Sequence, residues 1–372
     1  MEILELTSNM FCNAFYEKRV LVTGHTGFKG SWLCNWLTML GANVYGLSLP
    51  PTEENKLFQQ IKLRERLADS VACDVRDKQA TTKYISLSRP DFLFHLAAQP
   101  LVRRSYGEPT ETFDINILGT ANVLEGLRTL NKKCTAIIVT TDKCYENQEW
   151  LHAYRENDAL GGHDPYSASK ACAEIVAHSY RRSFFLQGSP IKVATARAGN
   201  VIGGGDWAED RIFPDILRAI RSGEAVKIRN KTATRPWQHV LEPLSGYMWL
   251  AAKLDIASPA EASVLDSFNF GPNRSSNKTV EQLVQEVLTH ADGSWTDCSD
   301  PTQPHEASLL NLSIDKAHHL LEWHPVWNFT TTIKMTMDWY QSESISDMID
   351  RTNQQTHEYK QIASSLNLPW SK

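Results

Sequence analysis

The chain has 372 residues, of which 42% are apolar and 22% charged, as is ordinary for a globular protein with a sizeable core. Its formal net charge of −5 gives no reason to expect a nucleic-acid partner. The seven cysteines form no CxxC pair, no apolar run reaches membrane-spanning length, and the N-terminal "MEILELTSNM" carries acids where a signal peptide has basic residues, so we expect a cytoplasmic protein with reduced thiols and no membrane partner.

Short apolar runs alternate with longer amphipathic stretches in the first half of the chain. Buried strands are predicted at 19–24, 43–49, 69–74, 91–98, 135–141 and 191–198. Helices are predicted near 30–41, 77–88, 110–131 and 166–187. This alternation predicts an α/β fold, with a Rossmann-like doubly wound parallel sheet.

The pattern loosens after residue 200. Helical stretches at 211–224, 239–254 and 279–291 are interrupted by Gly/Pro-rich loops such as "GGGDW" and "FGPNRSSN". We interpret 17–200 as a dinucleotide-binding domain, to which a later segment such as 235–270 returns. Residues 201–343 are interpreted as mainly a smaller, C-terminal substrate-binding lobe, and residues 1–16 and 344–372 as peripheral extensions.

A glycine-rich loop, "VLVTGHTGFKGSW", follows the first predicted strand and opens the first predicted helix. Gly24, Gly27 and Gly30 let the chain turn tightly and let backbone N–H groups approach a pyrophosphate. A structural turn would explain a lone loop of this kind. The strand before it and the helix after it favour dinucleotide binding.

The second predicted strand ends in Ser48, where an acid would favour NAD, and no arginine adjoins it to receive a 2′-phosphate. The choice between NAD and NADP therefore stays open at this point. Asp74, at the end of the third predicted strand, has two interpretations of equal weight: it reaches the adenine amino group, or it caps the following helix.

"DPYSASK" places Tyr166 and Lys170 four residues apart, on one face of a predicted helix. A tyrosine with a pKa of about 10 is a poor base at neutral pH unless nearby positive charge stabilises the phenolate. Lowering that pKa by ~3 units needs roughly 4 kcal/mol, which an ammonium and a positively charged nicotinamide can supply together.

The strings "TGHTGFKG", "HLAAQPLVRRSY", "NILGTANVLE", "TTDKCYEN", "DPYSASK", "RAGNVIGGGDW" and "RPWQHVLEPLSGY" occur in this order over residues 18–340. In these motifs the chain resembles the extended short-chain dehydrogenase/reductases, the NAD-dependent epimerase/dehydratase family. Within that family it is most similar to sugar-nucleotide 4,6-dehydratases that act on a CDP-linked hexose. Such enzymes oxidise C4 of the sugar, eliminate water across C5 and C6, and return the hydride to C6.

The resemblance implies a role for each residue of a catalytic group. Tyr166 takes the C4 hydroxyl proton with help from Lys170, Thr141 hydrogen-bonds near the C4 oxygen, and Asp142 is the acid for water loss. Lys143 departs from the glutamate of dTDP-glucose dehydratases. It is the predicted C5 base, which requires a pKa far below about 10.4; the alternatives are a charge partner for Asp142 or an enolate stabiliser.

The resemblance also implies contacts with the cofactor, NAD, with NADP not excluded. The predicted cofactor-binding residues are Gly24, Thr26, Gly27, Phe28, Gly30, Asp74, Val75, Leu96, Ala97, Ala98, Asn116, Tyr166 and Lys170. For Asn116 the structural alternative is a cap at a helix N-terminus.

A sugar-nucleotide diphosphate needs cationic or backbone donors. The predicted substrate-binding residues are Gln99, Ser105, Asn200, Arg211, Arg235 and His239. A core position is an equal interpretation of Trp237, and a structural histidine the favoured one for His239. Arg103 and Arg104 have the alternative of a solvated surface pair. His305 and Glu306 fall where related enzymes close the nucleotide pocket, and no role is assigned to them.

No motif calls for a metal ion. By resemblance, the helices at 110–131 and 166–187 form a homodimer or homotetramer interface. Two other functions remain: a 4-epimerase, a reductase or a dehydratase for dTDP- or GDP-sugars on the same scaffold, or a binding protein without chemistry. The ionisable pair at Asp142 and Lys143 argues against an epimerase or a reductase, since neither needs it.

Overall fold

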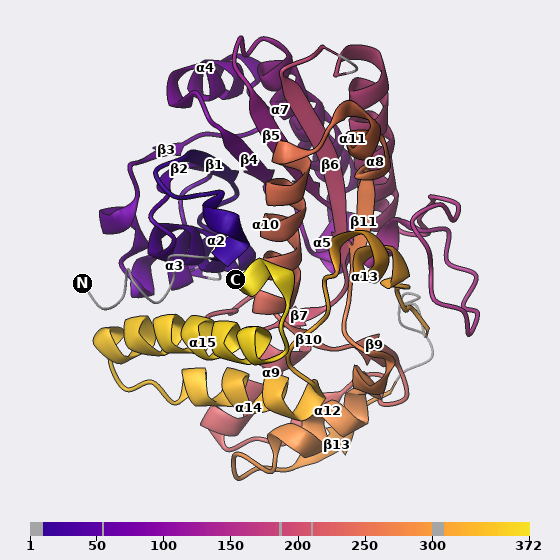
Figure 1. The fold of residues 1–372 in the computed structure, drawn as a ribbon. Helices are drawn as coiled ribbons and strands as arrows, with labels where there is room; N and C mark the ends of the chain where they lie inside the picture. The colour runs from indigo at the N-terminus through magenta and orange to yellow at the C-terminus, as the bar shows by residue number, and fades with distance from the viewer. Residues whose placement is uncertain (1–9, 54–55, 186–187, 210, 300–308) are drawn as a thin grey trace.

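The computed structural model describes residues 10–53, 56–185, 188–209, 211–299 and 309–372. At its centre lies a seven-stranded parallel sheet with the order β11–β6–β5–β4–β1–β2–β3 (Figure 1). Its strands are β1 (Arg19–Thr23), β2 (Asn43–Ser48), β3 (Asp69–Ala72), β4 (Phe92–His95), β5 (Cys134–Val139), β6 (Ile191–Ala198) and β11 (Ser267–Phe270). The predicted α/β class and the six predicted strands are confirmed.

Helices cover both faces of this sheet, so its central strands are apolar without interruption. Leu21 and Leu93 point to the face covered by α4 (Lys78–Ser88), α7 (Gly119–Arg128) and α8 (Pro165–Phe184). Val20 and Phe94 point to the opposite face, covered by α2 (Phe28–Met39) and α10 (Leu241–Ile256). The alternation of side chains along a strand therefore divides the apolar residues between two cores.

The predicted helix at 110–131 forms as three pieces: α6 (Pro109–Phe113), a π-helical turn η4 (Asp114–Leu118) and α7. Shorter elements connect the rest. They are α3 (Leu57–Gln60), η3 (Leu63–Arg66), α5 (Val102–Gly107), η5 (Asp142–Cys144), α11 (Pro259–Val264), η6 (Arg274–Ser276) and α13 (Asp315–Leu321).

The strand β11 is absent from the predicted strands. Its four residues lie beside β6 at the edge of the sheet, and α10, which precedes it, packs on the sheet. Both elements fall within residues 235–270. A run as short as "SFNF" carries too few alternating positions to be recognised as a strand from sequence.

The lower part of the molecule in Figure 1 consists of small paired strands and helices. Its strands are β7 (Val201–Ile202), β8 (Val226–Ile228), β9 (Thr234–Pro236), β10 (Gln238–His239), β12 (Asn277–Thr279) and β13 (Trp295–Asp297). Its helices are α9 (Ile212–Ser222), α12 (Val280–Val287), α14 (Phe329–Tyr340) and α15 (Ile345–Ser365). Among the described residues, no helix has the length and apolarity needed to cross a membrane.

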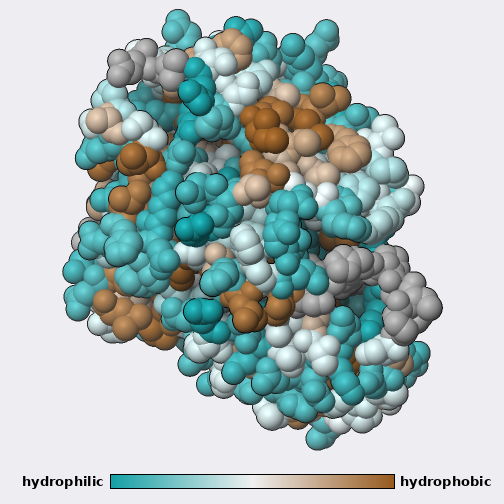
Figure 2. All heavy atoms as spheres, turned by 90° about the vertical axis from the view of Figure 1, so that its right-hand side faces the viewer, coloured by the Kyte–Doolittle hydropathy of each residue, from teal (hydrophilic) through white to brown (hydrophobic). Residues whose placement is uncertain are grey.

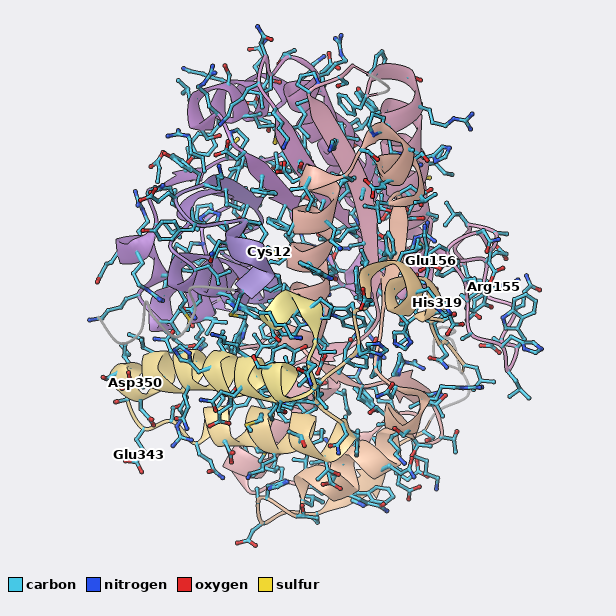
Figure 3. The ribbon with its side chains drawn as sticks, in the orientation of Figure 1. Cys12, Arg155, Glu156, His319, Glu343 and Asp350 are labelled. Carbon is cyan, nitrogen blue, oxygen red and sulfur yellow. The ribbon has the colours of Figure 1, made fainter. Side chains whose placement is uncertain are left out.

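The two terminal segments, expected to be peripheral, instead enter the main core in their described parts. The turn η1 (Met10–Asn13) meets the C-terminal turn η7 (Pro369–Ser371), near the labelled Cys12 in Figure 3. Phe11 and Trp370 are fully buried and stack with ring centroids 5.4 Å apart. The C-terminal segment was predicted to be peripheral because α15 is mostly polar and buries only one narrow face.

A buried carboxyl group ties α15 to the Rossmann half. Glu242 of α10 accepts hydrogen bonds from the Tyr359 hydroxyl at 2.6 Å, the Trp327 N–H at 2.7 Å and the Val326 N–H at 3.0 Å. Burial raises the pKa of this carboxyl from 4.5 to about 7, although these donors oppose the rise.

Stability should therefore depend on the protonation of Glu242. Because its folded pKa lies above the unfolded value, its contribution is fully present below pH 4.5 and is lost as the pH rises through about 7. We expect the free energy of unfolding of the unchanged protein to fall by on the order of 3 kcal/mol over this pH range. Glu242→Gln should abolish this fall. Urea unfolding of both proteins at about pH 5 and about pH 8 measures this difference; parallel pH dependences would contradict it.

Candidate active site

The glycine loop brings the first turn of α2 close to the end of β4. Gly24 has a φ of +71°, and a Cβ there would lie 2.7 Å from the Ala97 backbone nitrogen. A Cβ on Gly30 would lie 2.1 Å from the Gly24 oxygen. Only glycine allows both approaches. Gly27 precedes the helix without a side-chain cap, so the backbone N–H groups of the first turn remain for a ligand.

The residues around this loop leave a cradle for a dinucleotide. Thr26 anchors the loop to β2 through the Ser48 hydroxyl at 2.8 Å and the Leu49 oxygen at 3.0 Å. Leu96, Ala97 and Ala98 follow β4 and are half-buried, and Phe28 and Val75 are buried. The tight glycines and the uncapped helix end fit the pyrophosphate of NAD.

Asp74 does not cap α4. Asp77 holds that position, and its side chain accepts the Ala80 N–H. The Asp74 carboxylate instead accepts two hydrogen bonds from the Arg76 guanidinium, at 2.6 and 2.9 Å, and these hold its pKa below the usual range. One of the two predicted interpretations of Asp74 is thus wrong, and contact with adenine stays a prediction.

Asn116 is not a helix cap either. It lies within the π-helical turn η4 and is 1% exposed. Its amide accepts the Gln99 N–H at 2.9 Å and donates to the Gln99 oxygen at 3.1 Å and to the Ser169 hydroxyl at 2.8 Å. Asn116 therefore braces the loop after β4 against the catalytic helix α8, beside the predicted cofactor position.

Tyr166, Thr141 and Asp142 lie together. The Thr141 hydroxyl donates to the Asp142 carboxylate at 2.9 Å and also acts on the Tyr166 phenol, whose pKa it lowers. Asp142 is 1% exposed, and its second oxygen, Oδ2, is buried without a hydrogen-bond partner. A Cβ at Gly199 would lie 2.6 Å from this oxygen, so the glycine leaves room for it. A buried carboxylate oxygen without a partner is costly to the fold and indicates a functional position.

The phenol is less acidic than the sequence suggests. Burial raises the pKa of Tyr166 to about 12; the Thr141 hydrogen bond opposes the rise, Asp142 adds to it and Arg211 opposes it. The protein's own charges therefore do not produce the expected low pKa. Lys170, predicted to lower it, is not among these causes.

A buried ionic network stabilises the helix that carries Lys170. The Lys170 ammonium donates to the Val139 oxygen at 3.3 Å, and burial lowers its pKa to about 8 while Glu174 opposes the change. Glu174, one turn further along α8, pairs with Arg197 at 2.9 Å and accepts hydrogen bonds from the hydroxyls of Thr140 and Thr195. This network fixes the helix position from which Lys170 extends.

Lys143 is half-buried beside this group. Its backbone N–H donates to the Thr141 hydroxyl at 3.4 Å. Within the described chain, no ion pair joins its ammonium to Asp142, so the predicted charge-partner role receives no support.

Two predicted substrate contacts have hydrogen-bond partners within the protein. The Gln99 amide bonds to the Leu101 backbone and, at 2.9 Å, to the Thr112 hydroxyl. Ser105 is fully buried and donates to the Val102 oxygen at 2.6 Å within its own helix. Both polar groups therefore have partners inside the protein, and their contact with the substrate stays a prediction.

His239 is also structural. It is fully buried, with its ring 4.8 Å from that of Trp327 and 5.7 Å from that of Trp32, and burial lowers its pKa to about 3. Its burial favours the structural alternative, and contact with the substrate stays a prediction. Trp237 likewise belongs to the main core, where its indole N–H donates to the Lys278 oxygen.

The other predicted diphosphate ligands have these positions. Asn200 lies between β6 and β7 and is half-buried. Arg211 begins α9, pairs with Asp206 at 2.8 Å and acts electrostatically on Tyr166. Arg235 lies in β9, is 7% exposed and donates to the Thr234 oxygen. Arg104 forms surface ion pairs with Glu108 and Glu111. His305 and Glu306 lie outside the described residues.

One charged residue of this region is missing from the sequence predictions. Lys29, the second residue of α2, interacts electrostatically with Asp142, Asp206, Arg211 and Lys170. A signal was present, because the first turn of a helix disfavours a cation, and a residue that breaks a local preference is often functional.

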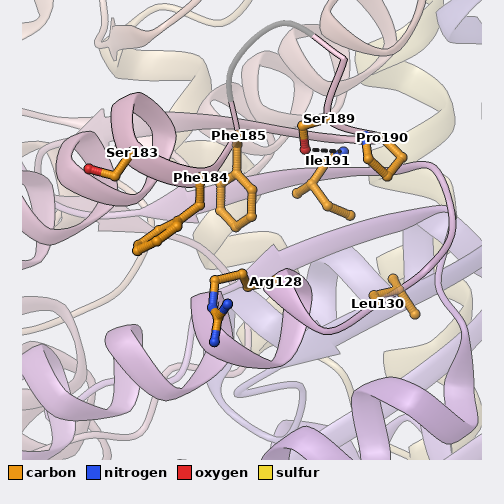
Figure 4. Close-up of a pocket in the computed structure, with 8 residues that line it drawn as sticks. All are labelled: Arg128, Leu130, Ser183, Phe184, Phe185, Ser189, Pro190 and Ile191. Atoms are coloured by element: carbon orange, nitrogen blue, oxygen red, sulfur yellow. Dashed lines mark hydrogen bonds between the residues drawn. The ribbon is translucent and has the colours of Figure 1, made fainter.

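A shallow hollow of about 310 Å³ lies elsewhere, at the amino end of the sheet (Figure 4). Arg128, Phe184 and Phe185 line it with the segment Ser189–Ile191. Ligands of parallel α/β sheets bind at the carboxyl ends of the strands, where the groups above converge. The hollow is therefore no part of the active site.

The chain resembles known proteins in sequence and in fold. It is 45% identical over 336 residues to CDP-glucose 4,6-dehydratase of Salmonella typhimurium, covering 89% of this chain and 92% of that protein. It is 26% identical to dTDP-glucose 4,6-dehydratase 1 of Escherichia coli, covering 88% and 93%. The epimerase Mth375 of Methanothermobacter thermautotrophicus has the same fold, with a TM-score of 0.73 over 98% of both chains and 21% identity.

A parallel sheet with a glycine cradle, and a Tyr–Lys helix beside it, define a dinucleotide-dependent enzyme of the extended short-chain dehydrogenase/reductase type. Residues 21–336 match the family model described as GDP-mannose 4,6 dehydratase. The chain belongs to this family.

Proposed function

We propose that the protein is an NAD-dependent hydro-lyase that converts CDP-glucose to CDP-4-keto-6-deoxyglucose. The observation that carries this proposal is the Tyr166–Thr141–Asp142 group, which places an oxidation base and a dehydration acid on either side of one hydroxyl. The 45% identity to the Salmonella CDP-glucose 4,6-dehydratase supports the choice of substrate. NAD is present in the Bacillus cereus UDP-glucuronic acid 4-epimerase complex, a protein of the same fold (TM-score 0.71, 22% identity).

The chemistry begins with the loss of the C4 hydroxyl proton to Tyr166. When bound, NAD would supply the acceptor for the C4 hydride and its donor to C6, and its positive charge would favour the phenolate. Lys170 adds a second positive charge to this site. The resulting C4 carbonyl acidifies the C5 proton, so that water can leave across C5 and C6.

Water loss needs an acid at the C6 oxygen, and Asp142 supplies it. The base removes the C5 proton and later returns it, so it ends each turnover unchanged. Tyr166 has then gained one proton and Asp142 has lost one. The Thr141 hydroxyl joins these two side chains and can carry the resetting proton from the phenol to the carboxylate.

Substrate binding is proposed for three side chains. Arg211 and Arg235 can bind the diphosphate, and Asn200 can donate a further hydrogen bond. An epimerase or a reductase needs Tyr166 and Lys170 but gains nothing from a buried carboxylate oxygen without a partner. Asp142 therefore favours dehydration over both alternatives.

The test is incubation of the purified protein with CDP-, dTDP-, GDP- and UDP-hexoses, followed by mass spectrometry. We expect a product lighter by one water from CDP-glucose, which absorbs near-ultraviolet light after treatment with alkali. A product of unchanged mass would indicate an epimerase. Faster water loss from another sugar nucleotide would retain the reaction and overturn the proposed substrate.

A homo-oligomer is part of the proposal. Figure 2 looks onto the side of the molecule where α8 lies and shows apolar residues gathered in its upper half. Ile175 and Phe184 of α8 and Leu118 of η4 are more than half exposed. Exposed apolar side chains on neighbouring helices fit an interface with a second copy of the chain.

A further inference from the structure

A buried ion pair contacts the chain on both sides of the turn that carries the proposed dehydration acid. This turn, residues 141–144, consists of η5 and its cap Thr141 and is called the catalytic turn below. The ion pair joins Glu174 of α8 to Arg197 of β6 at 2.9 Å, and each of the two residues is 3% exposed. Apolar residues often stabilise a fold as well as a buried ion pair does, so stability alone does not account for this pair.

Glu174 binds the residue that directly precedes the catalytic turn. One oxygen of its carboxylate accepts a hydrogen bond from the Thr140 hydroxyl. The other oxygen accepts one from the Thr195 hydroxyl of β6 at 2.7 Å. The neighbouring Val139 oxygen accepts the Lys170 ammonium at 3.3 Å. Two consecutive residues at the end of β5 are therefore bound by side chains of α8.

Arg197 binds the residue that directly follows the catalytic turn. Its guanidinium donates to the Tyr145 hydroxyl at 2.7 Å, and this hydroxyl donates to the Asn269 side-chain oxygen of β11 at 2.7 Å. Tyr145 is 1% exposed. The ion pair thus holds the chain immediately before and immediately after the turn, from two different elements of the fold.

Both members of the pair carry their charge. Burial raises the pKa of the Glu174 carboxyl, but Arg197 and the hydrogen bonds outweigh burial and hold this pKa below 4.5. Burial lowers the pKa of Arg197, and Glu174 more than offsets this effect. Hydrogen bonds to charged groups are shorter and stronger than those between neutral groups, so they hold their partners tightly in place.

Glu174 shares α8 with the proposed catalytic side chains, one turn beyond Lys170 and two turns beyond Tyr166. From these contacts we infer that Glu174 and Arg197 are positioning residues of the dehydration, which hold the catalytic turn against α8 so that Asp142 and Tyr166 reach C6 and C4 of the same hexose. Both act through the backbone of the turn. A shift of about 1 Å between reacting groups can lower a rate on the order of 100-fold.

Removing one hydroxyl group from the full-length protein tests this role without removing a charge. With CDP-glucose and NAD, Thr140→Val should lower formation of the 4-keto-6-deoxy product about tenfold or more, because the turn loses its bond to Glu174. Oxidation at C4 should continue, so quenched samples should contain oxidised sugar nucleotide that has kept its water. The KM for CDP-glucose and the affinity for NAD should stay within about twofold of wild type. Thr140→Ser, which keeps the hydroxyl, should restore product formation.

Thr195→Val is the matched control. It removes the same group from the same carboxylate of Glu174, but Thr195 lies within β6 and is not adjacent to the catalytic turn. We expect its kcat within about twofold of wild type. Equal slowing in Thr140→Val and Thr195→Val would overturn the inference, since it would reduce the ion pair to a structural role. Normal product formation in Thr140→Val would also overturn it.

A double variant, Glu174→Leu with Arg197→Met, tests the pair itself. Apolar side chains of similar size often replace a buried ion pair without loss of stability, whereas removal of one partner would leave an unpaired charge. We expect urea unfolding and NAD affinity close to wild type, with product formation at least as slow as in Thr140→Val. A folded double variant that forms product at the wild-type rate would contradict the positioning role.

This role rests on the proposed function, and the two fail differently. Wild-type protein that eliminates water from no sugar nucleotide would refute the proposed function and the positioning role together. Water elimination that proceeds normally in wild type, Thr140→Val and the double variant would refute only the positioning role.

Discussion

Tyr166→Phe is expected to lower kcat on CDP-glucose by about 1,000-fold, with neither oxidised nor dehydrated sugar accumulating. The Tyr166 phenolate is the base of the Tyr166–Thr141–Asp142 group that can take the C4 hydroxyl proton while Asp142 keeps its own. Without C4 oxidation the C5 proton is not acidic, so every later step stops. Steady-state rates and mass spectrometry of quenched reactions measure this effect.

Tyr180→Phe is the matched control, because it removes a phenol from the same helix, where the hydroxyl contacts Glu125 at 3.4 Å, far from the catalytic group. We expect its kcat within about twofold of wild type. Tyr166→Phe that still oxidises the sugar at more than about a tenth of the wild-type rate would remove Tyr166 from the proposed role.

Asp142→Asn should give a different defect of similar size. We expect formation of the 4-keto-6-deoxy product to fall by about 1,000-fold, while C4 oxidation continues. An amide occupies the space of the buried carboxyl but cannot protonate the C6 hydroxyl. Rapid quenching should therefore recover sugar nucleotide that has lost two hydrogens and no water.

The Asp142→Asn result can be separated from misfolding. Urea unfolding and NAD binding of the variant report the fold and the cofactor site, and both should stay close to wild type because Asp142 Oδ2 has no hydrogen-bond partner to lose. Normal water loss in Asp142→Asn would contradict the role of Asp142 as the acid. Loss of oxidation as well would show that Asp142 acts in the first step.

The motifs of the active site could be predicted because each depends on neighbours in sequence. The glycine loop needs three glycines between a strand and a helix, and Tyr166 and Lys170 share a helix face through their spacing alone. The direction in which polar side chains turn could not be predicted. Gln99, after β4, donates to the Thr112 hydroxyl of α6, and this pairing depends on how the two segments pack, which no local pattern encodes.

The same distinction explains the fold. Alternating apolar runs determine six strands of the sheet, whereas β11, with four residues, becomes a strand only beside β6. From their sequence, the terminal segments were predicted to be polar extensions. Phe11 and Trp370 nevertheless meet in the core, because two distant parts of the chain cover one face of it together. The spacing of apolar residues indicates one helix or strand at a time and cannot indicate which distant segments pack together.

Sequence alone determined the parallel α/β architecture, the dinucleotide loop and the shared helix face of Tyr166 and Lys170, because strand alternation, glycine geometry and helical spacing are local. Thr141 and Asp142 were added by the resemblance to known enzymes. Tertiary structure alone decided which charges share a space. It buried Asp142 beside Gly199 and raised the pKa of Tyr166. Burial and long-range electrostatics set these properties, and both arise only once separate elements are packed together.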